Sequence, residues 1–552
     1  MGKKILLTGI GLSAILGSFG ETKQLLASKP NILIILADDM GFSDIGCYGS
    51  EIKTPNIDNL SKNGLRFTQF YNSARCCPTR ASLLTGLYPH QAGMGYMSDS
   101  NLSPNYQGFI NDNCVTIAQV LKESGYFTAA TGKWHIGDKD STVWPLQRGF
   151  DRFYGIPSGG GFYNGKATKS IFDGNKILIP AESQLPNDYY TTTIWADYGI
   201  KYIDEANGKN KPFFLYLAFN APHWPLQAPQ SIIRRYLGLY KDGVEPSRIK
   251  RYQKMMESGI IDKNYKLTPP DTTVKSWESL SAKERLFQDS IMATYAACVE
   301  LMDLNIGRVV DCLKKRGILD NTLIFFMSDN GGCAEGIASG LGNNSGIGAV
   351  GNPQSFVQCG RGWANLQNTP FSMYKHYAHE GGIHTPLIVH WPAGINAKNE
   401  IRKQPGHIID LMATCIDVSK SAYPKLLNGI SIIPFQGVSL VPAFTNKSLH
   451  RDTLGWEHEG NRAIRIKNWK LVSKAKVLSR LTPKDVKNWE LYDLSRDPTE
   501  TDNLAASHPE KVKKMSEEWV KWAISKKVLP SPWGNYDTIK MLNQKRTIKR
   551  VE

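Results

Sequence analysis

Residues 30–39 read PNILIILADD, an unbroken apolar run followed directly by the two carboxylates Asp38 and Asp39. An apolar run of this length is typical of a β-strand that is buried on both faces. Ligands of open α/β sheets bind outside the carboxyl ends of the strands, so both aspartates are expected at a ligand site. Adjacent carboxylates repel each other, and a bound cation relieves that repulsion. The alternative, a solvated Asp-Asp turn, fits less well directly after a buried strand.

Apolar runs and amphipathic periods alternate along the rest of the main part of the chain. They predict helices and strands, in chain order, at residues 55–63, 65–71, 116–124, 212–219, 291–315, 322–327 and 386–391. This alternation favours an α/β fold with a mainly parallel sheet between helices. Residues 230–290 are expected to form a polar insertion. Residues 333–370, rich in Gly, Asn and Ser, are expected to form a long functional loop.

The pattern changes near residue 446, beyond which short predicted strands precede one helix at 509–525. This order predicts a smaller C-terminal α+β domain. At the other end, Lys3 and Lys4 precede a short apolar stretch, which is typical of a secretory signal and too short for a comfortable membrane span. An uncleaved anchor is the alternative. We therefore predict an exported protein, periplasmic or secreted, with a signal peptide at 1–22, a main domain at 28–445 and a C-terminal subdomain at 446–552.

The 552 residues carry a formal net charge of +16, which permits nucleic acid, anionic polymers or acidic membranes as partners. No helix-turn-helix, zinc-finger or RNA-binding signature is present, so an anionic substrate fits better and we expect no nucleic-acid partner. No segment after the first twenty residues is suited to stable membrane insertion. The nine cysteines are scattered without a C-x-x-C pair, which argues against a disulfide framework or a zinc site. The sequence does not indicate an oligomeric state.

Residues 76–86 read CCPTRASLLTG and predict a helix start with reactive groups at its beginning. Pro78 suits the first helical position, because its missing N–H has no intrahelical partner there. Cys76 is then expected just before the helix, where free N–H groups and the helix dipole favour an anion. Arg80 lies in the first turn and supplies a cation. The alternative is an inert buried cysteine pair.

The spacing C-x-P-x-R with the following Leu84-Thr85-Gly86 resembles the signature of the type I sulfatases of the alkaline phosphatase superfamily. The resemblance implies that a maturation enzyme converts Cys76 to formylglycine after translation. It also implies an alkaline-phosphatase-like sandwich of a mainly parallel sheet between helices, with a smaller C-terminal α+β domain. Cys77, Thr79 and His384 depart from the residues that the family usually has at their positions.

Two pairs of oxygen-bearing side chains follow predicted strands: Asp38 with Asp39, and Asp329 with Asn330. Three carboxylates and an amide oxygen form a hard-oxygen set that suits Ca²⁺ or Mg²⁺ better than zinc. The resemblance implies that these four residues, together with the converted Cys76, bind one calcium ion.

Four further groups lie in loops at predicted strand ends: Lys133, His135, His223 and Lys375. The resemblance places them, with Arg80, around the sulfate and the leaving group. It implies that a formylglycine hydrate attacks sulfur, that His223 or Lys375 protonates the departing alcohol, and that His135 accepts the proton whose loss releases sulfate. Such an enzyme would hydrolyse a sulfated carbohydrate, for example a sulfated galactose or N-acetylhexosamine of a polysaccharide or host glycan.

Substrate contacts are less well specified. Four segments are candidates to line a sugar site: 88–91, which contains His90, the insertion at 230–290, the loop at 333–370, and 456–462, which contains Trp456, His458 and Arg462. The last segment carries aromatic and charged groups together. A turn at the domain junction explains that segment equally well. Two other functions share the predicted fold: a phosphodiester or phosphonate monoester hydrolase, and a glycan-binding protein without turnover.

Overall fold

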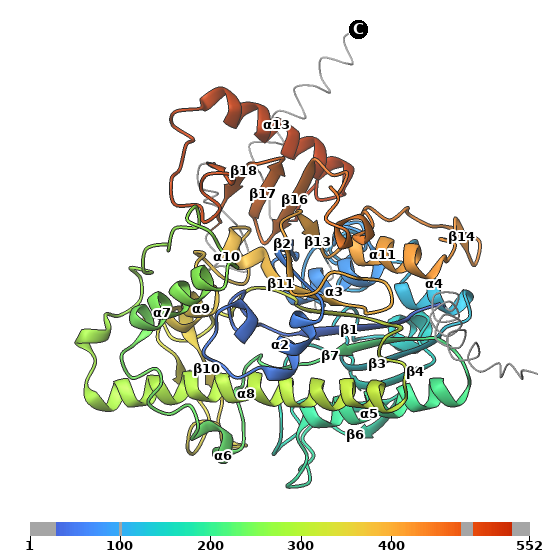
Figure 1. Ribbon diagram of the computed structural model, residues 1–552, viewed down its shortest axis with the longest axis horizontal. Coiled ribbons are helices and arrows are strands. Elements are labelled where there is room, and N and C mark those ends of the chain that lie inside the picture. Colours follow the sequence, from blue (N-terminus) through green and yellow to red (C-terminus); the bar gives the residue numbers. More distant parts are fainter. Residues whose placement is uncertain (1–28, 99–101, 476–488, 533–552) are drawn as a thin grey trace, which may run out of the picture.

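The computed structural model describes residues 29–98, 102–475 and 489–532 (Figure 1). The predicted signal peptide at 1–22 lies outside these residues. Within them, a central sheet of eleven strands has the order β12-β2-β11-β8-β1-β7-β3-β4-β5-β6, with β13 paired to β2. Its strands are β1 (Asn31–Ala37), β2 (Leu65–Tyr71), β3 (Phe127–Lys133), β4 (Arg152–Ile156), β5 (Ile171–Asp173), β6 (Lys176–Ile179), β7 (Phe213–Ala218), β8 (Thr322–Ser328), β11 (His384–His390), β12 (Glu400–Arg402) and β13 (Gly406–His407).

Strand β1 lies in the middle of the sheet and runs parallel to both neighbours, β7 and β8. The pairs β3–β7 and β3–β4 are also parallel, whereas β11 is antiparallel to β2 and β8. The predicted α/β class with a mainly parallel sheet is therefore confirmed. Because β1, β3, β7 and β8 are parallel, their carboxyl ends meet at one edge of the sheet.

Both faces of the sheet are buried under helices. Alternate residues of β1 enter two separate cores, Leu33 and Ile35 into one and Ile32 and Ile34 into the other. The first core contains residues of the helices α2 (Pro55–Lys62), α5 (Thr191–Gly208) and α8 (Ala282–Lys315). The second contains residues of α3 (Cys76–Thr85), α4 (Ile117–Glu123) and α11 (Asp410–Ser419). In Figure 1, α8 runs along one side of the whole molecule.

Two helices begin earlier than the sequence predicts. Helix α8 begins at Ala282, because Ser281 and Glu284 form a capping box ahead of the apolar segment. Helix α3 begins at Cys76, with Arg75 at the N-cap, so Cys76 is the first helical residue and Pro78 the third. Pro78 is still tolerated, because none of the first N–H groups of a helix has an intrahelical acceptor.

The predicted insertion and long loop contain secondary structure of their own. Residues 230–290 include α6 (Gln230–Ile233) and α7 (Val244–Glu257). The loop expected at 333–370 contains β9 (Asn343–Asn344), β10 (Val357–Gln358) and the helix α9 (Gly360–Gln367), followed by α10 (Glu380–Ile383). The sequence did not predict α9, because glycines at 360 and 362 are poor helix formers.

The C-terminal part is a four-stranded antiparallel sheet with one long helix, as predicted for a small α+β unit. Its elements, after the short β14 (Leu426–Leu427), β15 (Ile430–Ser431) and α12 (Val441–Phe444), are β16 (Thr453–His458), β17 (Asn461–Ile466), β18 (Trp469–Ser473), β19 (Glu490–Asp493) and α13 (Pro509–Ser525). Buried Lys470 of β18 lies 2.6 Å from Glu380 of the main part and 2.7 Å from Glu500. Among the described residues, no helix is both long and apolar enough to cross a membrane.

All nine cysteines lie within the described residues, and each is a free thiol there. They therefore provide no covalent constraint on the fold.

Candidate active site

Two carboxylate-bearing loops meet at the carboxyl edge of the central sheet. Ala37 of β1 pairs with Ser328 of β8, so the residues that follow the two strands are brought side by side. The amide of Asn330 donates to Asp39 Oδ1 at 2.8 Å, and the backbone N–H of Asp39 donates to Asp329 Oδ1 at 3.3 Å. Asp38, Asp39, Asp329 and Asn330 are all buried. The structure thus brings the four predicted metal ligands together.

Three cations contact these carboxylates directly. Lys133 Nζ lies 2.6 Å from Asp38 Oδ2, and Lys375 Nζ lies 2.9 Å from Asp39 Oδ2. Arg80 of α3 donates to Asp329 Oδ2 through Nε at 2.9 Å and Nη2 at 2.7 Å. Every one of these charged groups is removed from water, so the cations and carboxylates compensate one another.

His223 completes this group of charges. Its Nε2 lies 3.4 Å from Asp39 Oδ2, and its Nδ1 lies 2.5 Å from the carbonyl oxygen of Trp224. Since a carbonyl oxygen only accepts, Nδ1 carries the proton of that hydrogen bond and Nε2 is directed to the site.

The carboxylates titrate differently because of these neighbours. Burial opposes ionisation of Asp38, but Lys133, His223 and Arg80 outweigh it and lower its pKa to about 2. Burial and the charge of Asp38 raise the pKa of Asp329 well above its usual range. A divalent cation would remove this conflict by favouring ionisation of both.

Two oxygen atoms of the predicted metal ligands are left without a hydrogen bond, as expected for atoms that contact a cation. Asp38 Oδ1 and Asn330 Oδ1 are buried and have no hydrogen-bond partner among the described residues. Buried acceptors without partners are costly unless an ion or water contacts them. Carboxylate and amide oxygens together form the ligand set that hard divalent cations prefer.

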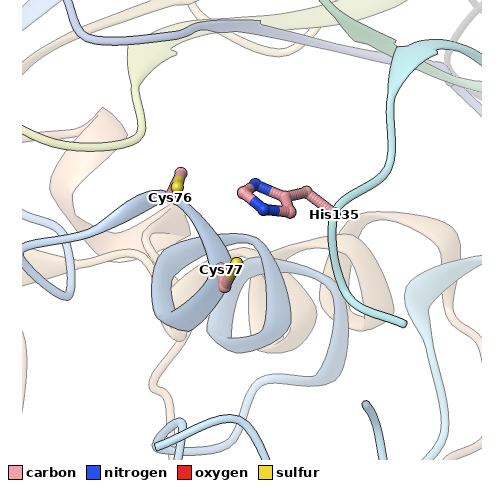
Figure 2. Close-up of side chains that lie close together, drawn as sticks. All are labelled: Cys76, Cys77 and His135. Carbon is pink, nitrogen blue, oxygen red and sulfur yellow. The ribbon is translucent and has the colours of Figure 1, made fainter. Parts of the chain in front are cut away.

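Cys76, Cys77 and His135 form a second cluster. Figure 2 shows the His135 ring extending from the loop after β3 toward Cys76 and Cys77 at the start of α3. The ligand atoms of these three residues lie within 4.8 Å of one another. Contact with the Cys77 thiol, opposed by burial and assisted by His135 and Lys133, lowers the pKa of Cys76 well below its ordinary value. Position 76 therefore favours a negatively charged group.

Known proteins are similar to this chain over the part that contains the site. The profile of the sulfatase family matches residues 30–421, and the profile described as "N-sulphoglucosamine sulphohydrolase, C-terminal" matches residues 371–524. An uncharacterized sulfatase of Schizosaccharomyces pombe is 36% identical over 550 residues, covering 92% of this chain and 96% of the relative. This chain belongs to the sulfatase family.

Two further relatives agree with that assignment. An arylsulfatase of Klebsiella aerogenes is 32% identical over 458 residues, covering 80% of this chain and 96% of the relative. The solved structure of Ps i-CgsB in complex with k-i-k-neocarrahexaose is 27% identical, with a TM-score of 0.65 and coverage of 93% of this chain and 96% of that one. The predicted family, the alkaline-phosphatase-like fold and the sulfatase activity are thus confirmed. Sulfatases generally bind a divalent metal, which agrees with the oxygen ligands described above.

Three of the four candidate sugar contacts, His90, Trp456 and His458, are buried, and Arg462 is partly buried. His90 is fully buried and lies 2.7 Å from Glu457, and the indole N–H of Trp456 donates to the carbonyl oxygen of Asn72. His458 is buried, and Arg462 lies over the rings of Trp489 and Trp519. His90 and Trp456 join the C-terminal sheet to the main part through these contacts, and substrate binding by the four residues stays a prediction.

His384, a departure from the sulfatase pattern, is also accounted for. Its Nδ1 lies 2.8 Å from Glu380, and its Nε2 lies 2.7 Å from the carbonyl oxygen of Thr68. His384, the first residue of β11, therefore has a structural role in which it contacts Glu380 and the backbone of β2.

The sequence did not single out four residues that lie beside the site: Arg75, Glu335, His376 and Glu459. Arg75 and His376 directly adjoin the predicted residues Cys76 and Lys375 in the chain. No motif marks Glu335 or Glu459, because their proximity depends on long-range folding of two separate loops.

Proposed function

We propose that this sulfatase removes sulfate from a sulfated carbohydrate by means of a formylglycine made from Cys76. The observation that carries the proposal is the position of Cys76 at the start of α3, facing His135 and close to the group of buried cations and carboxylates. The k-i-k-neocarrahexaose in the complex of the structural relative Ps i-CgsB supports a carbohydrate substrate. The preferred sugar of the present enzyme would be a sulfated galactose or N-acetylhexosamine.

The catalytic cycle begins with the hydrate of the formylglycine aldehyde. One hydroxyl of the hydrate first loses its proton to solvent, its oxygen attacks sulfur, and the bond between sulfur and the sugar oxygen breaks. The departing alkoxide takes a proton from His223 or Lys375. His135 then accepts the proton of the second hydroxyl, the carbon–oxygen bond to sulfate breaks, and the aldehyde re-forms with release of sulfate. Water adds to the aldehyde to restore the hydrate.

The surrounding residues would stabilise the charge of the transferring sulfuryl group. Lys133, Lys375 and Arg80 bring three positive charges to a buried site, where electrostatic interactions are stronger than in water. The His135 ring packs directly against Gly159. Any larger residue at position 159 would displace the ring, because a Cβ there would lie 2.0 Å from its Nε2.

Asp38, Asp39, Asp329 and Asn330, with the converted Cys76, would hold one Ca²⁺, and Mg²⁺ is the less favoured ion. The ion would supply positive charge that favours the deprotonated nucleophile and the sulfuryl oxygens. The chain's own carboxylates at the carboxyl ends of β1 and β8 would hold this ion.

Parallel assays on sulfate and phosphate esters test the proposal. Purified protein from a host with a formylglycine-generating enzyme would receive matched sulfate monoesters, phosphate diesters and phosphonate monoesters. We expect sulfated sugars to be hydrolysed with the highest kcat/KM. A higher value for a phosphate diester or phosphonate would favour the hydrolase alternative, and no turnover at all would favour a glycan-binding protein.

The proposal includes the place where the protein acts. The basic and apolar residues before Gly20 support export, so that the enzyme meets glycans in the periplasm or outside the cell. A maturation enzyme that generates formylglycine would be its necessary partner.

A further inference from the structure

Four partly exposed residues lie beside the buried site and form what we call the rim cluster: Arg75, Glu335, His376 and Glu459. Their side chains are 14%, 30%, 16% and 17% exposed, whereas those of Lys133 and Asp38 are fully buried. The cluster therefore lies where the substrate's outer part would meet solvent.

Each member of the rim cluster is tied to the site by the chain or by a contact. Arg75 directly precedes Cys76, and His376 directly follows Lys375. Glu335 Oε1 lies 3.9 Å from Lys375 Nζ, and its Oε2 accepts from the indole N–H of Trp224, the neighbour of His223. Glu459, in the turn between β16 and β17, brings the C-terminal sheet to the same place.

Within the cluster, the cationic groups contact both carboxylates. Arg75 lies 3.4 Å from Glu459 and 3.9 Å from Glu335. His376 Nδ1 lies 2.8 Å from Glu459 Oε2, and its Nε2 lies 3.6 Å from Glu335 Oε1. Arg75 and His376 are therefore each already in contact with both carboxylates.

Both carboxylates are held in the ionised form. Burial opposes ionisation of Glu335, but Lys375, His376 and Arg75 lower its pKa well below the usual range. Burial likewise opposes ionisation of Glu459, and His458, His376 and Arg75 lower its pKa strongly. An ionised carboxylate accepts hydrogen bonds from hydroxyl groups and repels other anions.

We propose that the rim cluster selects the group carrying the sulfate: a neutral sugar whose free hydroxyls donate to Glu335 and Glu459, in preference to a sugar with a second sulfate or a carboxylate beside the scissile one. This inference rests on the proposed carbohydrate substrate. Within the described residues, the cations of the cluster are already paired with Glu335 and Glu459, so a second anion would meet two negative charges. Like charges at a binding site reduce affinity for the wrong ligand.

The test compares kcat/KM for a monosulfated galactose oligosaccharide with that for its disulfated counterpart. We expect the wild-type enzyme to favour the monosulfated sugar by about 10-fold or more. Glu335→Gln and Glu459→Gln should each lower this ratio by about 10-fold, because the amide keeps the shape of the side chain and removes the charge. Glu123→Gln, an exposed change outside the site, is the matched control and should leave the ratio unchanged.

The ratio separates recognition from a structural role. If the two glutamates only held Arg75 and His376 in place, the variants would lose activity on both sugars equally and the ratio would not move, which would overturn the inference. A wild-type preference for the disulfated sugar would overturn it without any variant. Wild-type hydrolysis of 4-nitrophenyl sulfate but of no sulfated sugar would instead refute the proposed carbohydrate substrate, and this inference with it.

Discussion

Two residues of the site have backbone conformations that L-amino acids rarely adopt. Asp39 has φ 64° and His135 has φ 60°, both in the left-handed region. Such conformations cost about 1 kcal/mol or more for a residue with a Cβ, and they persist only where the surrounding structure enforces them. In this sulfatase the packing of loops at the sheet edge does so, and it directs both side chains into the site.

The His135 ring offers a precise test of this enforced position. Gly159→Ala would place a Cβ 2.0 Å from Nε2 of His135, so the ring must move. A misplacement of about 1 Å in a catalytic group costs roughly 100-fold in rate, and we expect kcat on an aryl sulfate to fall by that amount. Gly208→Ala, where an added Cβ meets nothing within 4 Å, is the matched control. Equal activity of the two variants would show that His135 does not depend on Gly159.

The nucleophile gives a second residue-scale prediction. A serine at position 76 lacks the second hydroxyl of a hydrated aldehyde, so it has no route to expel sulfate. Cys76→Ser should therefore lose about 1,000-fold or more of its multiple-turnover rate. Time courses on 4-nitrophenyl sulfate measure this loss, with Cys47→Ser as a control outside the site. Sustained turnover by Cys76→Ser would contradict the mechanism.

At the scale of elements, strand β18 is fixed to the main part by one buried lysine. Lys470 lies 2.6 Å from Glu380 and 2.7 Å from Glu500, all three buried. Lys470→Met removes the lysine that both buried carboxylates contact, and we expect the free energy of unfolding to fall by about 3–5 kcal/mol. Denaturant titration of the variant measures this. Lys514→Met, on the exposed face of α13, should change it by less than about 0.5 kcal/mol.

Strand β19 adds a contact that depends on pH. Burial opposes ionisation of Glu490, but hydrogen bonding and charge from His379 lower its pKa from 4.5 to about 2. A lowered folded-state pKa stabilises the fold above pH 4.5, and this stabilisation is lost as the pH falls toward 2. The Tm difference between wild type and Glu490→Gln should thus be larger at pH 7 than at pH 3. A difference that stays constant would contradict this contribution.

The elements also show how much the sequence predicts. The apolar runs of β1, β7 and β8 gave the sheet and its carboxyl edge, because burial on both faces leaves a local signal. Helix α9 and the early start of α8 were missed, since glycines and an exposed capping box carry no apolar periodicity. Glu335 and Glu459 lie in two segments that the sequence marks as candidates for a sugar site, 333–370 and 456–462, but their contact with Arg75 depends on long-range folding, which no local spacing encodes.

At the scale of the whole molecule, the proposed ion would join the central strands β1 and β8. A ligand that binds only the folded state raises its stability by RT ln(1 + [L]/Kd), or about 2.7 kcal/mol at a hundredfold excess over Kd. Dialysis against EDTA should therefore lower Tm and abolish activity, and Ca²⁺ should restore both better than Mg²⁺ does. Asp329→Asn should weaken this response to Ca²⁺. Unchanged Tm and activity after EDTA treatment would argue against a structural ion at this position.

The central claim is that Cys76 of this sulfatase acts as a formylglycine. The most direct measurement is the mass of the peptide containing residue 76, taken from protein purified from its native source. The account predicts the mass of an aldehyde, or of its hydrate, in place of the thiol. An unmodified cysteine in that native protein would contradict it.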